Sequence, residues 1–255
     1  MQDITVADFS ERYLQEARTF YKSFSPLASV LKTFSSQYGP RQLATITPPD
    51  IHTYVHHRLK AGRKASTINQ ELALLRSAIN YVRHHWGIDM PNPVSRQRLK
   101  TTALRLRYHS PTEAKALVQH ANRRQVAMFI QLALHTGCRK NELLTLRWSD
   151  IDLDRAFILL RPENTKANKA RAVPLNQTAL KALQVLQEGN DSPWVFTNAK
   201  GEQKKSINWS FRKSLESAGI QDFHIHDLRH TFASWLVSEG VELIKVRDLL
   251  GHSTI

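Results

Sequence analysis

The chain has 255 residues, a formal net charge of +14 at pH 7 and a pI of about 10.1. This length predicts two domains with separate cores, and the charge predicts a polyanionic partner, with a basic but inert surface as the alternative. The single cysteine excludes an intrachain disulfide, and the sequence contains no run of 18 apolar residues that could span a membrane. We therefore expect a cytoplasmic, nucleoid-associated protein.

Four helices are predicted in the first hundred residues. Apolar residues recur at helical spacing in four segments, which begin after Thr5, after Pro26, at Pro48, and at a cap formed by Ser66 or Thr67. The fourth pattern is the clearest, and Gly87 is placed to end it. Four apolar stripes with short connections predict a small helical bundle, which we assign to residues 1–95.

The fourth helix also carries polar residues at every seventh position, namely Asn69, Arg76 and Arg83. This spacing puts them along one side of the helix, from which they could read a DNA major groove. Basic residues just before the helix would then meet phosphates: Lys60, Arg63 and Lys64. A solvated polar face is the competing interpretation, and the pattern alone does not separate the two.

A basic connector is predicted between the two domains, over residues 96–109. It contains five basic residues: Arg96, Arg98, Lys100, Arg105 and Arg107. No acidic residue lies among them, which favours an exposed segment along a phosphate backbone over a packed element. The second domain begins at residue 110, where Ser110, Pro111 and Glu113 form a capping box.

The second domain, residues 110–255, shows helices, then two short strands, then helices. A strongly apolar helix ends at Gly137, and strands over 157–160 and 172–175 are joined by a polar hairpin. Further helices are predicted over residues 176–187, 206–218, 226–239 and 243–250. The whole chain is therefore expected to be mainly α with a small β-sheet, an α+β fold.

Two arginines of this domain are candidates for binding a phosphate, Arg139 and Arg229. Attack at a phosphodiester builds negative charge on the non-bridging oxygens, and a guanidinium pairs with two oxygens and keeps its proton. Arg229 falls at the border of the apolar arc of its helix, where a charge usually has a partner. A structural ion pair is the alternative for either arginine. Glu142, three residues after Arg139, is expected to be a structural partner of that arginine.

His226 lies three residues before Arg229, so both side chains lie on one helical surface. Its imidazole could donate to a phosphoryl oxygen or transfer a proton. His224, His226 and His230 could also suggest a metal site, but no cysteine or spaced carboxylate completes it. We therefore expect neither a metal nor a cofactor.

Four motifs follow one another in a fixed order: Thr136-Gly137-Cys138-Arg139, Thr165-Lys166, His226-Asp227-Leu228-Arg229 and Leu250-Gly251-His252. Each is weak alone, but together they resemble the tyrosine recombinases of the phage integrase family. The resemblance covers nearly the whole chain and implies an N-terminal helical core-binding domain of the SAM-like type, whose fourth helix binds DNA, followed by a catalytic domain. It implies that Arg139 and Arg229 bind the scissile phosphate, that Lys166 is the general acid, with Lys169 as the alternative, and that His226 and His252 are active-site histidines.

The resemblance also implies a site-specific recombinase that breaks and rejoins double-stranded DNA through a 3′-phosphotyrosyl intermediate. The family's tyrosine is expected on the order of ten residues beyond His252, whereas the sequence ends at Ile255. The chain is therefore expected to lack the nucleophile segment and to be inactive by itself. A non-catalytic DNA-binding remnant and a metal-dependent nuclease are the alternatives. A homotetramer on DNA is implied for the full-length parent, and a monomer off DNA is expected for this chain.

Overall fold

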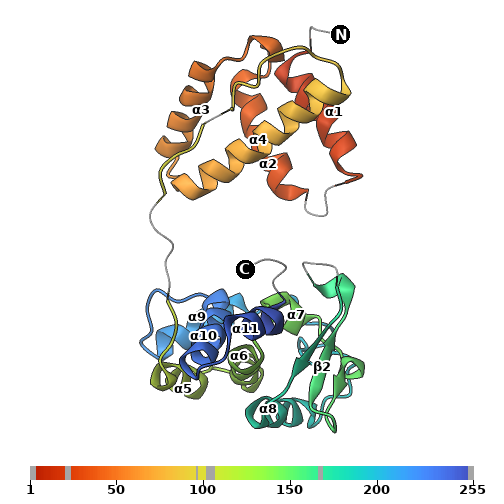
Figure 1. Cartoon of the computed structure of the whole chain (residues 1–255), viewed down its shortest axis with the longest axis vertical. Coiled ribbons are helices and arrows are strands. Elements are labelled where there is room, and N and C mark those ends of the chain that lie inside the picture. Colours follow the sequence, from red (N-terminus) through yellow and green to blue (C-terminus); the bar gives the residue numbers. More distant parts are fainter. Residues whose placement is uncertain (1–3, 21–23, 96, 102–106, 166–168, 252–255) are drawn as a thin grey trace. The chain divides into compact units, whose positions relative to one another are not determined.

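The computed structural model describes residues 4–20, 24–95, 97–101, 107–165 and 169–251. The chain divides into two compact units, residues 1–104 and 105–255, each with its own hydrophobic core (Figure 1). The predicted α+β fold is confirmed, because both units are mainly helical and a small sheet lies in the second. Among the described residues, no helix combines the length and apolarity needed to cross a bilayer.

Unit 1 is the predicted helical bundle. Its helices are α1 (Val6–Ala17), α2 (Ser25–Tyr38), α3 (Pro48–Lys60) and α4 (Ala65–His85), with a short 3-10 helix over Leu43–Thr45. Thr5 caps α1 by accepting a hydrogen bond from the backbone N–H of Asp8. The predicted cap of α4 is wrong, because Lys64 has the extended backbone of an N-cap and the helix already begins at Ala65.

The core of unit 1 forms around the apolar stripe of α4, whose five members are at most 1% exposed: Ile68, Leu72, Leu75, Ile79 and Val82. A polar group is buried beside this stripe. Glu71 accepts hydrogen bonds from the Tyr54 hydroxyl at 2.9 Å and from Nε and Nη2 of Arg58 at 2.8 and 2.5 Å. A buried carboxylate is tolerated only with such partners, so the three side chains tie α3 to α4.

The first part of the predicted connector packs against α4. Asn69 donates from Nδ2 to the Leu99 carbonyl at 2.9 Å and accepts from the Leu99 N–H at 2.8 Å. Arg76 donates from Nη2 to the carbonyls of Val94 and Gln97, both at 3.1 Å. The expectation of a wholly exposed connector is therefore wrong at Gln97 and Leu99, because polar side chains of α4 bond to their backbone groups.

Unit 2 holds the remaining helices: α5 (Pro111–Gln119), α6 (Arg124–Thr136), α7 (Lys140–Leu144), α8 (Gln177–Gln187), α9 (Asn208–Ser217), α10 (Ile225–Ser238) and α11 (Leu243–Leu250). Short 3-10 helices cover Trp148–Asp150 and Pro162–Asn164. The buried helix α6 packs against α5, α8 and α10, and it ends at the predicted Gly137, whose φ of +62° is left-handed.

The sheet of unit 2 is antiparallel, in the order β1 (Ile151–Asp152), β2 (Phe157–Leu160) and β3 (Arg171–Pro174). Ile158 is paired with Val173, and both side chains are buried. The sheet lies beside α7 and α8 (Figure 1). The start of β3 is close to the first turn of α7, because Arg171 donates to Glu142.

The end of the predicted connector belongs to unit 2. The ring of His109 is fully buried and stacks on Phe223, with 3.6 Å between the ring centroids. Its backbone N–H donates to Thr231 Oγ1 at 3.0 Å, and its carbonyl accepts from Trp235 Nε1 at 3.0 Å. This segment is therefore anchored on α10.

Candidate functional site

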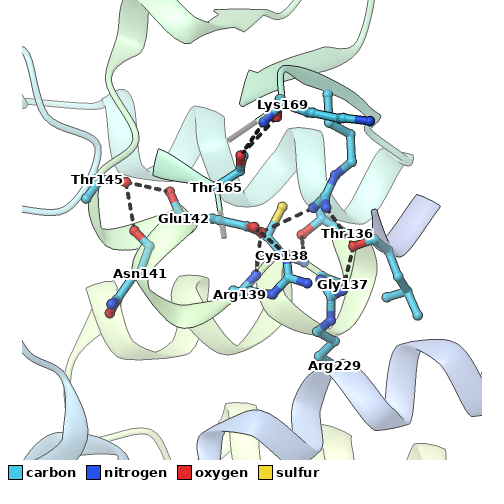
Figure 2. A network of polar contacts seen from close by, with 12 residues as sticks. Thr136, Gly137, Cys138, Arg139, Asn141, Glu142, Thr145, Thr165, Lys169 and Arg229 are labelled. Atoms are coloured by element: carbon cyan, nitrogen blue, oxygen red, sulfur yellow. Dashed lines mark hydrogen bonds and ion pairs between the residues drawn. The ribbon is translucent and has the colours of Figure 1, made fainter. Parts of the chain in front are cut away.

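Arg139 and Arg229 lie in the same polar network of unit 2 (Figure 2). Arg139 follows the Gly137 turn at the end of α6, and Arg229 comes from α10, 90 residues later in the sequence. The network lies where the α6–α7 turn, α10, the end of α11 and the start of β3 meet.

Arg229 is 3% exposed, so it lies deeper than the helix border on which the sequence placed it. Its Nη1 donates to the Gly137 carbonyl at 2.6 Å, and its Nη2 donates to the Leu250 carbonyl at 2.5 Å. Burial, together with the nearby charge of Arg139, lowers the pKa of Arg229 to about 10. The group therefore still carries its positive charge at neutral pH.

Arg139 is the N-cap residue of α7 and is more accessible, with 24% of its side chain exposed. Its Nη1 donates to Glu142 Oε1 at 2.8 Å, and its backbone N–H donates to Glu142 Oε2 at 2.8 Å. The expectation that Glu142 is a structural partner of this arginine is confirmed. A carboxylate in the first turn also complements the helix N-terminus, which helps to explain why Glu142 is buried at 1% exposure.

Arg171, at the start of β3, completes the network and was missed in the sequence. Its Nη1 donates to the Leu250 carbonyl at 2.6 Å, and its Nη2 donates to Glu142 Oε2 at 3.2 Å. The partners lie 79 and 29 residues away in the chain, so no local spacing pointed to this residue. The one available signal was a basic residue at the start of a strand that otherwise reads as apolar.

A cavity of about 450 Å³ opens beside the network. Its lining includes Arg139, Glu142, Thr165 and His226, so it brings three of the four motifs together. His226 is an exposed residue of α10. Desolvation by neighbouring atoms, followed by the charges of His230 and Arg229, holds the pKa of His226 below its ordinary value. The neutral imidazole is therefore favoured near neutral pH, and this form can accept a proton.

Lys166 and His252 lie outside the described residues, and the nearest described residues are Thr165 and Lys169 for the first and Gly251 for the second. Thr165 Oγ1 donates to the Pro162 carbonyl at 3.0 Å and to the Lys169 carbonyl at 2.9 Å, and it accepts from the Lys169 N–H at 3.1 Å. The hydroxyl thus links Thr165 to both Pro162 and Lys169. Lys169, the alternative acid, is exposed.

The predicted DNA-binding residues fall into two groups. The exposed ones are Lys60, Arg63, Lys64, Arg98 and Lys100. The half-buried ones are Asn69, Arg76, Arg83 and Arg107. Asn69 bonds to Leu99, and Arg76 bonds to Val94 and Gln97. Arg107 Nη2 is 3.3 Å from Glu113 Oε1. Arg96 and Arg105 lie outside the described residues. A role in DNA binding stays a prediction for all of these residues.

The site has the chemistry of an anion-binding centre. Three guanidinium groups, of Arg139, Arg171 and Arg229, surround one carboxylate, that of Glu142. Two of the recorded partners of Arg229 are backbone carbonyls, which satisfy its N–H groups without neutralising its charge. A desolvated cluster of this kind favours a bound anion with several acceptor oxygens, such as a phosphate. Within the described ranges, no three histidine, cysteine or acidic side chains are grouped to hold a metal.

Comparisons with known proteins agree with this assignment. The model described as "Phage integrase family" matches residues 107–255, and that of the "Phage integrase, N-terminal SAM-like domain" matches residues 12–84. The integrase of Salmonella phage P22 is 37% identical over 164 residues, which are 59% of this chain and 42% of that protein. The tyrosine recombinase XerD of Rhizobium meliloti is 31% identical over 96% of this chain and 80% of its own length.

The fold agrees as well. A phage lambda integrase, solved as a tetramer bound to a Holliday junction, superposes with a TM-score of 0.84 over 99% of this chain and 79% of that one, at 19% identity. The chain covers less than two thirds of the length of the P22 integrase, so it corresponds to only part of that relative. Matched over most of its length by the two domain models and by a relative above 30% identity, the chain belongs to the phage integrase family of tyrosine recombinases.

Proposed function

We propose that this chain carries the DNA-binding and phosphate-binding parts of a site-specific recombinase that breaks and rejoins DNA through a 3′-phosphotyrosyl intermediate. The observation that supports it most directly is the network in which Arg139 and Arg229, far apart in sequence, share one buried centre. Two positive forks at one point match the two non-bridging oxygens of a phosphodiester under attack.

In this proposal the two arginines stabilise the charge that develops on the phosphate, so the reaction needs no metal ion. His226, which lines the cavity beside Arg139, donates to a phosphoryl oxygen or transfers a proton. Lys166 protonates the leaving 5′ oxygen, and His252 contacts the phosphate. The attacking tyrosine lies beyond Ile255, and the bond energy stored in its ester with the 3′ phosphate permits rejoining without ATP.

Double-stranded DNA is the proposed partner of both units. The exposed basic residues of unit 1 and of the connector supply phosphate contacts, which give most of the affinity and make it depend on salt. The lambda integrase with the same fold was solved on DNA as a tetramer. For the full-length parent of this chain we extend that to a homotetramer on DNA, and for the chain by itself we expect a monomer in the absence of DNA.

The test is a suicide DNA substrate, in which cleavage releases a short strand and traps the covalent protein–DNA adduct. The assay compares this 255-residue chain with one extended through the segment that follows Ile255 in its gene. The extended chain should form an adduct, and the shorter chain should bind the same DNA without forming one. Arg139→Ala in the extended chain should slow adduct formation by about 10²–10³-fold, the usual effect of removing one transition-state donor.

Arg155 provides the matched control, because it lies in the β1–β2 turn of the same unit with 81% of its side chain exposed. Arg155→Ala should leave the rate of adduct formation unchanged. Arg229 is buried, so Arg229→Lys accompanies Arg229→Ala in case the alanine variant does not fold. Binding without any adduct in the extended chain would instead favour a non-catalytic DNA-binding remnant, and cleavage that a chelator abolishes would favour a metal-dependent nuclease.

A further inference from the structure

We propose that Arg171 is a positioning residue, which holds the end of α11 against Glu142 and thereby keeps Arg139 and Arg229 aligned on one phosphate. The inference rests on the proposed function and goes beyond the residues that the sequence motifs identify. It is carried by hydrogen bonds, by burial and by a close backbone approach.

The Arg171 side chain connects two elements that are far apart in sequence. It is 11% exposed, and its two terminal nitrogens point to different partners. Nη1 reaches the Leu250 carbonyl at the end of α11 at 2.6 Å, whereas Nη2 reaches Glu142 in the first turn of α7 at 3.2 Å. A planar fork can make both contacts at once, whereas the single ammonium group of a lysine is poorly shaped for it.

Each partner of Arg171 also binds one of the two candidate phosphate-binding arginines. Glu142 accepts from Arg139 at 2.8 Å, and the Leu250 carbonyl accepts from Arg229 at 2.5 Å. A shift of either partner would therefore move one guanidinium relative to the other. Displacements of about 1 Å are enough to reduce rates by about 10²-fold when reacting groups must be held in place.

The packing at Gly251 also places the Arg171 side chain over the last turn of α11. Gly251 has a left-handed φ of +66°, and a Cβ added there would lie 2.2 Å from Nη1 and 3.1 Å from Cδ of Arg171. A side chain at residue 251 would therefore require the Arg171 guanidinium to shift. Arg171 therefore contacts the end of α11 at Leu250 and Gly251, immediately before His252 in the sequence.

The arrangement is not the one expected for stability alone. Nε of Arg171 is buried and has no hydrogen-bond partner among the described residues. Leaving a buried donor unpaired is unfavourable, and a second positive charge beside Arg229 adds to the cost. The ion pair with Glu142 and the bond to Leu250 offset part of this cost, and the proposed alignment of two phosphate-binding groups is a further reason for an arginine here.

The first experiment measures amide hydrogen exchange in the 255-residue chain, so it does not depend on catalysis. Arg171→Ala should speed exchange at the C-terminal amides of α11 by about tenfold, the effect of losing one charge-assisted hydrogen bond. Arg171→Lys should give a smaller increase at the same amides. Arg155→Ala and Arg155→Lys, on the exposed turn of the same sheet, should leave α11 unchanged.

The second experiment uses the extended chain and the suicide substrate, and it separates binding from chemistry. Arg171→Ala should lower the rate of adduct formation at saturating DNA by about 10–100-fold, while the DNA concentration at half-saturation changes by less than about threefold. Arg171→Lys should restore part of the rate, because an ammonium group can keep one of the two contacts.

The outcomes distinguish this inference from the proposed function. Unchanged exchange in α11 of both Arg171 variants would overturn the positioning role. A parallel loss of DNA binding and rate would also overturn it, because Arg171 would then contact DNA itself. If the wild-type extended chain forms no adduct, the proposed function fails, whereas faster exchange in α11 would still support the tether between β3 and α11.

Discussion

Replacing Gly137 with alanine tests the close packing at the turn between α6 and α7. A Cβ at this position would lie 2.4 Å from Cδ1 and 2.7 Å from Cε1 of Phe232 on α10, and 3.0 Å from Cδ2 of Leu250. The left-handed φ of +62° costs an alanine about 1–2 kcal/mol. Forcing an extra carbon into a packed site typically adds about 1–3 kcal/mol. The lower entropy of the unfolded alanine chain returns about 0.4–1 kcal/mol. We therefore expect a net loss of about 1–5 kcal/mol.

Gly189→Ala is the matched control, because Gly189 has a similar φ of +68° and nothing lies within 4 Å of its added Cβ. Urea unfolding followed by tryptophan fluorescence suits the comparison, since Trp148, Trp194, Trp209 and Trp235 belong to unit 2 and Trp86 alone belongs to unit 1. The strain of the left-handed backbone is common to both variants, so their difference measures the steric clash. Equal destabilisation by the two substitutions would refute the reasoning. In a Phe232→Ala background, the cost of Gly137→Ala should fall toward that of Gly189→Ala.

Three further predictions concern buried polar groups and the polar side of α4. Glu71→Ala leaves the Arg58 charge buried without its partner, so it should destabilise unit 1 by about 3–5 kcal/mol in urea unfolding. A loss no larger than that caused by Glu11→Ala, at an exposed glutamate, would contradict this prediction. Burial holds the pKa of His109 below its ordinary 6.5. At mildly acidic pH the unfolded chain therefore binds a proton at this residue that the folded chain does not bind. The free energy of unfolding should be at its full value above about pH 6.5 and should fall as the pH drops below it. A His109→Asn variant should show a flatter dependence in unfolding measured from about pH 5 to 8, and an identical slope would exclude this origin. Asn69→Ala should lower the stability of unit 1 by about 1–2 kcal/mol, because it removes the two hydrogen bonds to Leu99. Arg83→Ala should leave stability unchanged and should reduce the salt dependence of DNA binding by the equivalent of about one phosphate contact. If unfolding and binding measurements gave the reverse pattern, Asn69 would be the DNA-binding residue and Arg83 the structural one.

Much of the fold could be predicted because its elements are periodic and well punctuated. The apolar stripe of α4, the glycine after α6 and the capping box at Ser110 are all local signals, and each appears where the sequence indicated. Helix α7 and strand β1 could not be predicted, since five and two residues are too few to show a period.

The candidate site also combines contacts that local sequence spacing predicts with contacts that depend on the tertiary fold. The pairing of Arg139 with Glu142 follows from a spacing of three residues, whereas the contact of Arg171 with Leu250 depends on how β3 and α11 meet. Asn69 shows the converse limit. Its place on the polar side of α4 was correct, but a helix pattern cannot reveal that another backbone segment covers that side.

The Leu250 carbonyl, which accepts from both Arg171 and Arg229, makes the framework of the site insensitive to acidity. Arginine keeps its proton across the physiological range, and even Arg229, with its pKa lowered to about 10, remains a cation in any ordinary cellular compartment. Neither acidification nor mild alkalinity can therefore release the end of α11. Any dependence of the proposed activity on pH must therefore enter through other groups, such as the His226 imidazole and the proposed general acid Lys166, while the guanidinium groups keep their charge.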